Sequence, residues 1–158
     1  MEPVAVSESR SVLVRWMGIE DSNTAGFVHG GVVMKLCDEV AGLAAIRHSR
    51  CRVVTAGMDR MTFNEPVERG DLVTFRASVN AAWRTSMEVG VRVEAERPGT
   101  GVVRHTSTAY VTMVALDEHG RPSEVPPLRT EDETEERRER DAQVRRRNRL
   151  AERAELRG

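Results

Sequence analysis

The chain has 158 residues, of which 39% are hydrophobic and 31% charged, with a formal net charge of -1. This length supports one domain with a real core, while the near-neutral charge argues against a nucleic-acid partner bound by the whole surface. No run of about 18 apolar residues predicts a membrane span, and no basic start followed by an apolar block predicts a secretion signal.

Two cysteines, Cys37 and Cys51, are too few for a disulfide framework and fit a reducing compartment. We therefore expect a cytoplasmic protein. Together with His48 they resemble a loose set of metal ligands, but the spacing completes no four-ligand site. We expect no metal.

The first predicted elements are a strand, a loop and a long helix. Residues 10–16 alternate, with Val12, Val14 and Trp16 on one side, which predicts a strand. Residues 17–26 are polar and small, as in a loop. Residues 28–48 favour a helix that is apolar around most of its circumference, and such a helix is buried. A buried helix needs other elements wrapped around it.

Four strands follow the helix. Residues 53–63 are rich in strand formers, and a turn-rich loop follows at 64–71. Residues 73–79 and 87–95 alternate cleanly between apolar and polar, which predicts antiparallel strands with one buried and one wet face. The last strand, 102–116, ends apolar on both faces. The order predicts an α+β fold in which an antiparallel five-stranded sheet is wrapped around one long central helix.

The end of the chain is almost wholly charged after a proline-bearing connector at 121–127. Acidic residues come first and arginines last, which is the polarity that a helix dipole favours. Apolar residues are sparse there, so we expect a solvated, charged C-terminal helix that does not pack strongly. We divide the chain into a domain at 8–128 and a charged helical tail at 129–158.

Asp38 is the leading catalytic candidate. It would lie on a mainly apolar helix face, where an unpaired carboxylate is costly and therefore often functional. A shielded carboxylate can act as a general base or as a nucleophile. The alternative is a surface carboxylate paired with Lys35 or Arg47.

Gly30 and Gly31 open the predicted helix, and the first amides of a helix have no partner within it. Because glycine permits close approach, these amides can hold a developing oxyanion; alternatively, the glycines only allow a tight turn. Asn23 could orient a water molecule or be an ordinary turn residue. His29 could be catalytic, but a histidine that caps or packs against the helix is more common.

The spacing on the helix limits how these groups combine. Gly30 and Asp38 are separated by about 12 Å of helical rise, so both cannot easily reach one substrate atom. If they do act on one substrate, Asp38 comes from a partner chain packed antiparallel. The sequence thus predicts a composite site at a dimer interface.

The residues together resemble the hotdog-fold acyl-CoA thioesterases, in particular the YciA-like and cytosolic brain acyl-CoA hydrolases, over about residues 8–128. The matching pieces are Asn23-x-x-Gly26, Gly30-Gly31-x-x-Met34-x-x-x-Asp38-Glu39-x-Ala41-Gly42, Val54-Thr55-Ala56, Phe63-x-x-Pro66-Val67-x-x-Gly70-Asp71, Arg84-Thr85-Ser86-Met87-x-Val89 and Tyr110-Val111-x-Met113-Val114-Ala115-Leu116-Asp117. The order of the pieces is more specific than any one of them.

The resemblance implies hydrolysis of acyl-CoA to a free acid and CoA, with no cofactor because CoA is part of the substrate. It implies that Asp38 activates water or attacks the carbonyl, that Asn23 positions the water or polarises the thioester, and that the amide of Gly30 or Gly31 holds the oxyanion.

The turn Arg84, Thr85 and Ser86 would bind the pantetheine and nucleotide end of CoA, although Trp83 departs from the small residue that relatives often carry there. The resemblance also implies homodimers, often gathered as trimers of dimers. Two other functions stay open: a non-catalytic acyl-CoA-binding regulator, and a hotdog enoyl-CoA hydratase or dehydratase.

Overall fold

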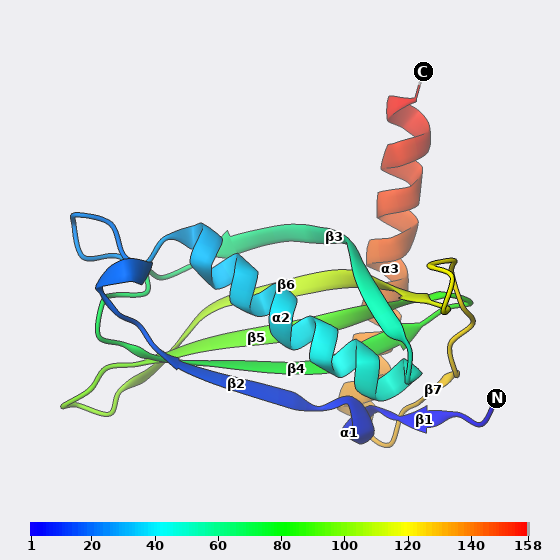
Figure 1. The fold of residues 1–158 in the computed structure, drawn as a ribbon, viewed down its shortest axis with the longest axis horizontal. Helices are drawn as coiled ribbons and strands as arrows, with labels where there is room; N and C mark the ends of the chain where they lie inside the picture. Colours follow the sequence, from blue (N-terminus) through cyan, green and yellow to red (C-terminus); the bar gives the residue numbers. More distant parts are fainter. Residues whose placement is uncertain (158) are drawn as a thin grey trace.

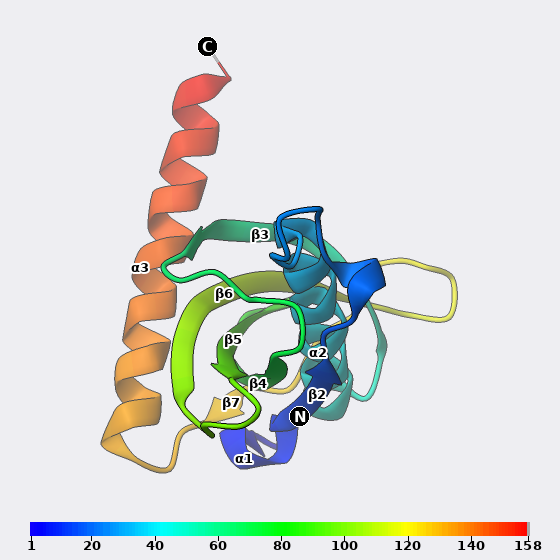
Figure 2. The ribbon, with the colours of Figure 1, turned by 90° about the vertical axis from the view of Figure 1, so that its left-hand side faces the viewer.

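The computed structural model describes residues 1–157 and contains the predicted α+β fold. Its five-stranded antiparallel sheet has the strand order β2-β4-β5-β6-β3. The strands are β2 (Ser11–Trp16), β3 (Arg52–Phe63), β4 (Leu72–Ala82), β5 (Ser86–Glu96) and β6 (Val103–Leu116). The sheet curls around the long helix α2 (Gly30–Ser49), which lies along its concave side (Figures 1 and 2). The predicted wrapping of one helix by a sheet is confirmed.

Smaller elements complete the chain. A two-stranded parallel sheet joins β1 (Val4–Ala5) to β7 (Leu128–Arg129), and the short helix α1 (Val6–Ser9) follows β1. A 3-10 turn, η1 (Ile19–Asp21), lies within the predicted loop before α2. Within residues 1–157, no helix is both long and apolar enough to cross a membrane.

The core lies between α2 and the inner face of the sheet. The period of two on the inner face is regular, because every second side chain of a strand points to the same side. The completely buried core side chains include Val73, Phe75, Val79, Met87, Val89, Val91, Val93 and Val111 from the sheet and Cys37, Val40, Ala41 and Ala44 from α2.

One face of α2 is not buried, which corrects the prediction that a helix apolar around most of its circumference is a buried one. Met34, Leu43 and Ile46 are 41%, 46% and 44% exposed, next to the wetted Lys35, Glu39 and Arg47. The reason is that the sheet covers only one side of the helix. β3 is an edge strand beside this face, and its Val54 and Phe63 are also exposed. An apolar strip of this kind is typical of an interaction surface.

The C-terminal helix α3 (Glu133–Leu156) crosses the convex side of the sheet, opposite α2 (Figure 2). The sequence predicted a solvated helix, but Ala142 is completely buried and Gln143 accepts a hydrogen bond of 3.0 Å from the Trp83 indole. Arg146 lies over the same indole ring. The distal part of α3 extends beyond the sheet (Figure 1).

Glu88 shows why the helix packs there. It was predicted on the wet face of β5 but is fully buried beneath α3. Its two carboxylate oxygens accept hydrogen bonds of 2.7 and 3.0 Å from Arg145, and Oε1 also accepts one of 3.1 Å from Asn80. A forked guanidinium–carboxylate contact satisfies a buried charge. The helix is therefore anchored by polar contacts rather than by an apolar stripe.

Candidate active site

Asp38 lies in the middle of α2, at the margin of its exposed strip. Its side chain is half-buried, and its Oδ1 accepts a hydrogen bond from the Thr55 hydroxyl of β3. The Thr55 hydroxyl also lies 3.6 Å from the Met113 sulfur. Within residues 1–157 Asp38 forms no ion pair with Lys35 or Arg47. A carboxylate held on one oxygen by a hydroxyl, next to apolar side chains, is suited to act as a base or a nucleophile.

The neighbouring Cys37 takes no part in this arrangement. Burial, and after it the negative charge of Asp38, raises the pKa of the Cys37 thiol to about 12. The thiolate is the reactive form of cysteine, so this thiol is inert near neutral pH. Its side chain belongs to the core.

Asn23 organises the loop that precedes α2. Its Oδ1 accepts hydrogen bonds from the backbone N–H of Ala25 at 3.0 Å and of Phe27 at 3.1 Å. This is an Asx-type turn, in which the side chain replaces backbone partners. Because the oxygen is occupied, the Nδ2 amide group is what an exposed Asn23 can offer to a substrate. The turn interpretation and the functional one are therefore compatible.

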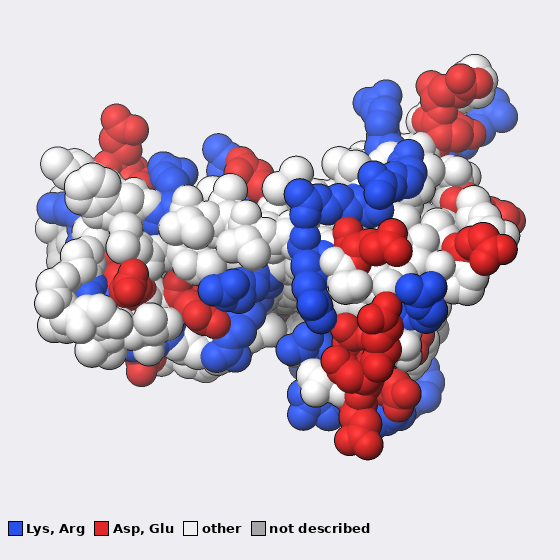
Figure 3. Space-filling view, turned by 90° about the horizontal axis from the view of Figure 1, so that it is seen from below, with Lys and Arg blue, Asp and Glu red and all other residues white. Residues whose placement is uncertain are grey.

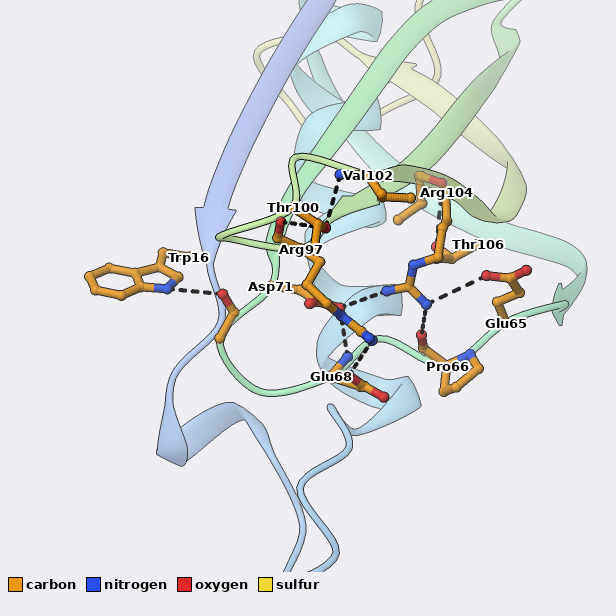
Figure 4. A network of polar contacts seen from close by, with 12 residues as sticks. Trp16, Glu65, Pro66, Glu68, Asp71, Arg97, Thr100, Val102, Arg104 and Thr106 are labelled. Carbon is orange, nitrogen blue, oxygen red and sulfur yellow. Dashed lines mark hydrogen bonds and ion pairs between the residues drawn. The ribbon is translucent and has the colours of Figure 1, made fainter.

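A polar network holds this loop in place. Arg69 donates hydrogen bonds to the Ser22 hydroxyl at 2.8 Å and to the Asn23 carbonyl at 3.1 Å. Arg69 belongs to the β3–β4 loop, which is fixed by the buried Asp71 (Figure 4). Asp71 Oδ2 accepts from the Glu68 N–H and from Arg104, each at 2.9 Å. The position of Asn23 is thus determined by charged groups of the β3–β4 loop and of β6.

The start of α2 presents unused donors. His29 precedes the helix without a side-chain cap, and it is exposed. In the described residues, the N–H groups of Gly30 and Gly31 have no hydrogen-bond acceptor, and both glycines are exposed. A Cβ added at Gly31 would meet no atom within 4 Å. These amides, at the positive end of the helix dipole, can hold an anionic oxygen.

The candidate residues form two separate groups in one chain. Asp38 lies beside Thr55, whereas Gly30 lies beside Phe63 at the opposite end of β3, where an added Cβ would be 3.4 Å from the Phe63 ring. Helical rise alone separates Gly30 from Asp38 by about 12 Å. One chain therefore does not bring Asn23 and the glycine amides together with Asp38.

The turn between β4 and β5 lies at the Asp38 end of the sheet. Ser86 pairs with Val114 of β6, which in turn pairs with Val54 of β3. Two strand spacings place Ser86 about 10 Å from Val54. Arg84 is exposed at this turn, and Thr85 and Ser86 are half-buried. The turn, Asp38 and Thr55 therefore form one of the two groups.

Sequence reasoning did not single out Thr55. Thr55 is part of the matching piece Val54-Thr55-Ala56, but no role was predicted for it, because threonine is common in strands and gives no local signal. Its hydrogen bond to Asp38 joins residues 17 apart in sequence. For metals, residues 1–157 contain no group of three His, Cys, Asp or Glu side chains able to hold an ion.

Comparison with known proteins gives consistent results. The sequence model of the thioesterase superfamily matches residues 25–102. The cytosolic acyl coenzyme A thioester hydrolase of Mus musculus is 38% identical over 139 residues, covering 87% of this chain but 36% of the mouse protein. The chain thus spans about a third of the length of that relative.

Two solved structures extend this likeness to the whole fold. An acyl-CoA hydrolase from Staphylococcus aureus, in complex with butyryl coenzyme A and coenzyme A, has a TM-score of 0.90 at 32% identity, covering 98% of this chain and 94% of that chain. A hexameric acyl-CoA thioesterase has a TM-score of 0.93 at 36% identity, covering 98% and 99%.

Structures of the Staphylococcus aureus hydrolase also exist with one asparagine, one aspartate or one threonine replaced by alanine. The three replaced residues have the same separations in sequence as Asn23, Asp38 and Thr55 of this chain.

Proposed function

The chain belongs to the thioesterase superfamily, and on that premise we propose that it hydrolyses acyl-CoA thioesters to a free carboxylic acid and CoA. The observation that carries the proposal is the hydrogen bond from the exposed Thr55 to the half-buried Asp38. These two residues have the same separation in sequence as the aspartate and the threonine that were replaced in the Staphylococcus aureus hydrolase. The only co-reactant is water, so the reaction needs no cofactor.

In the proposed reaction, Asp38 either takes a proton from the attacking water and passes it to the departing CoA sulfur, or attacks the thioester carbonyl itself. In the second route CoA leaves first, and water then cleaves the anhydride formed between the acyl group and Asp38, which frees the acid and supplies the proton of the CoA thiol. The Thr55 hydroxyl orients the carboxylate through Oδ1 and leaves Oδ2 for the reaction. As the carbonyl carbon becomes tetrahedral, its oxygen gains negative charge. The Asn23 amide and the N–H of Gly30 or Gly31 donate to this oxygen, and such donors act most strongly on the transition state. CoA leaves as its thiol.

This mechanism requires two chains. Gly30 lies about 12 Å along the helix from Asp38, and Asn23 belongs to the loop before the helix. We therefore propose that one site takes these donors from one protomer and Asp38 from the other. The exposed apolar side chains of Met34, Leu43 and Ile46 and the free edge of β3 supply the surface for a twofold homodimer. A twofold axis packs the two helices antiparallel and yields two equal sites.

The CoA part of the substrate is proposed to lie along the turn of Arg84, Thr85 and Ser86. The exposed Arg84 is suited to a phosphate through its charge and forked geometry. The dimers would assemble further as trimers of dimers, consistent with the hexameric thioesterase. We also propose a cytoplasmic location, which the name of the cytosolic relative and the unpaired thiols of Cys37 and Cys51 support.

The direct test is release of CoA, followed with a thiol reagent, from acyl-CoAs of increasing chain length. We expect wild-type protein to turn over at least one chain length. Asp38→Asn keeps the shape of the side chain and should abolish most hydrolysis while leaving CoA binding intact. Wild-type turnover by Asp38→Asn would contradict the role of Asp38.

The same assay separates the alternatives. A non-catalytic regulator would bind acyl-CoA without releasing CoA from any chain length. An enoyl-CoA hydratase would instead consume the absorbance of the enoyl thioester while keeping the thioester intact. Either result would refute the proposed hydrolysis.

A further inference from the structure

A cavity lies on the other side of the sheet from Asp38, between the convex face and the first half of α3. Its volume is about 400 Å³, within the range of small-molecule sites. Six arginines line it, and they are Arg10, Arg76, Arg92, Arg137, Arg138 and Arg145. Figure 3 shows basic side chains bordering a hollow on this part of the surface, next to a cluster of acidic ones. We call this cavity the arginine groove.

The floor of the groove brings two like charges together. Arg76 of β4 and Arg92 of β5 are directly opposite each other in the strand pairing, an arrangement that destabilises a sheet. They share one carboxylate, because Glu94 lies 2.8 Å from Arg92 and 3.9 Å from Arg76. One carboxylate does not neutralise two guanidinium groups. The floor therefore keeps an excess of positive charge.

The roof of the groove adds to this excess. Arg137 and Arg138 of α3 line the cavity, and neither forms an ion pair within the described residues. Arg145 is held by Glu88 and lies 3.6 Å above the centre of the Tyr110 ring, so it is fixed in place. Asp141 is the only acidic residue in the lining.

Neutral donors accompany these charges. Ser78 and Thr108, which carry hydroxyl groups, line the groove, and the Thr108 hydroxyl also lies 2.8 Å from His105 Nε2. Gly90 lies between Ser78 and Tyr110 in the strand pairing. Gly90 has no side chain, and the Asn80 amide lies over it, 2.6 Å from where a Cβ would stand. Guanidinium forks and hydroxyls together match the several oxygens of a phosphate chain.

From this geometry we propose that the arginine groove binds an oligophosphate anion, a ligand with two linked phosphates. The six arginines have only four carboxylates near them, so two positive charges stay without a negative partner. These carboxylates are Glu88, Glu94, Glu135 and Asp141. An anion bridging Arg76 to Arg138 would relieve the cross-strand repulsion and tie α3 to the sheet. This site is separate from Asp38 and Asn23.

Isothermal titration of the full chain with inorganic pyrophosphate at low ionic strength tests the proposal. We expect saturable binding with one site per chain. The double variant Arg76→Gln/Arg138→Gln changes two exposed side chains and should weaken binding about tenfold or more, since each lost charged hydrogen bond is worth over 1 kcal/mol. Thermal melts verify that the variant is folded.

A matched control removes the same charge elsewhere. Arg121→Gln/Arg153→Gln alters two exposed arginines outside the groove and should bind pyrophosphate as the wild type does. No saturable binding, or equal losses in both double variants, would overturn the proposal. A parallel titration with ADP distinguishes the source: tighter binding than pyrophosphate indicates a nucleotide, and equal or weaker binding indicates the free oligophosphate.

Hydrolysis of acyl-CoA without added pyrophosphate should be the same in wild type and both double variants. This measurement tests the two proposals separately, because the protein can hydrolyse acyl-CoA even if the arginine groove binds no pyrophosphate.

Discussion

The substitution Asn23→Asp separates the two tasks of the Asn23 side chain. Aspartate has nearly the same shape and still offers an oxygen to the N–H groups of Ala25 and Phe27, at the 3.0 and 3.1 Å positions that Asn23 Oδ1 now occupies. It has no Nδ2 donor. The loop is therefore retained while the proposed contact to the substrate oxygen is lost.

The expected loss follows from the cost of removing one oxyanion donor. Such a deletion lowers kcat by about 10²- to 10³-fold, or about 2.7–4 kcal/mol of transition-state stabilisation. The negative charge of aspartate adds repulsion toward the oxyanion, so the loss should not be smaller. The assay is steady-state CoA release with purified Asn23→Asp, together with a thermal melt that should match the wild type.

Asn23→Ala provides the contrast. It removes both acceptor bonds of the exposed turn, which we expect to cost about 1 kcal/mol of stability in addition to the loss of kcat. If Asn23→Asp retained a kcat close to that of the wild type, Asn23 would act only through the loop, and its proposed role would be wrong.

Three further predictions concern other residues. Thr55→Val removes the hydroxyl that donates to Asp38 and should lower kcat about 10- to 100-fold with little change in KM, whereas Thr55→Ser should keep most activity; equal kcat values for Thr55→Val and wild type would contradict the contact. Arg145→Ala leaves the buried Glu88 carboxylate without its cation and should lower the urea-derived free energy of unfolding by about 3 kcal/mol. Adding Glu88→Gln should recover part of that loss, and unchanged stability of Arg145→Ala would show that α3 is held otherwise. Because burial raises its pKa to about 12, Cys37 stays neutral at pH 8, so native protein should react with a thiol reagent only at Cys51, and unfolded protein at both cysteines; rapid reaction of both in native protein would be inconsistent with this burial.

The strands and the central helix were predictable because their signals are local. Alternation over residues 73–79 and 87–95 reports a face buried against a helix, and it needs no knowledge of distant segments. The order of the elements then gave the sheet wrapped around α2. The exposed strip of α2 was not predictable. The sequence pattern of an apolar helix face is the same whether the face packs against the chain's own sheet or against another chain.

The packing of α3 was missed for a different reason. Its polar contacts include those of Arg145 and Arg149 with the sheet and of Gln143 with Trp83 in the β4–β5 turn, and only Ala142 among its buried residues is apolar. A hydrophobic pattern cannot reveal such a face. Likewise, Glu88 was placed on a wet face because its partner, Arg145, is 57 residues away in sequence.

The candidate site was predictable in part. Asp38 stood out as a carboxylate on an apolar helix, and the Gly30–Gly31 pair stood out as a helix start. Thr55 did not, because its significance lies in one hydrogen bond across the fold. The two hydrogen bonds that Asn23 Oδ1 accepts were also not predictable, because the sequence does not tell which atom of the side-chain amide binds the loop backbone.

The central claim, that each site combines two chains, is tested most directly by mixing inactive variants. Asn23→Ala and Asp38→Ala proteins are unfolded together in equal amounts, refolded and assayed for CoA release. In a twofold dimer, half of the particles are mixed and each carries one intact site of two, so we predict about a quarter of the wild-type activity. Activity no greater than the average of the two parent variants would show that Asn23 and Asp38 do not act together across an interface.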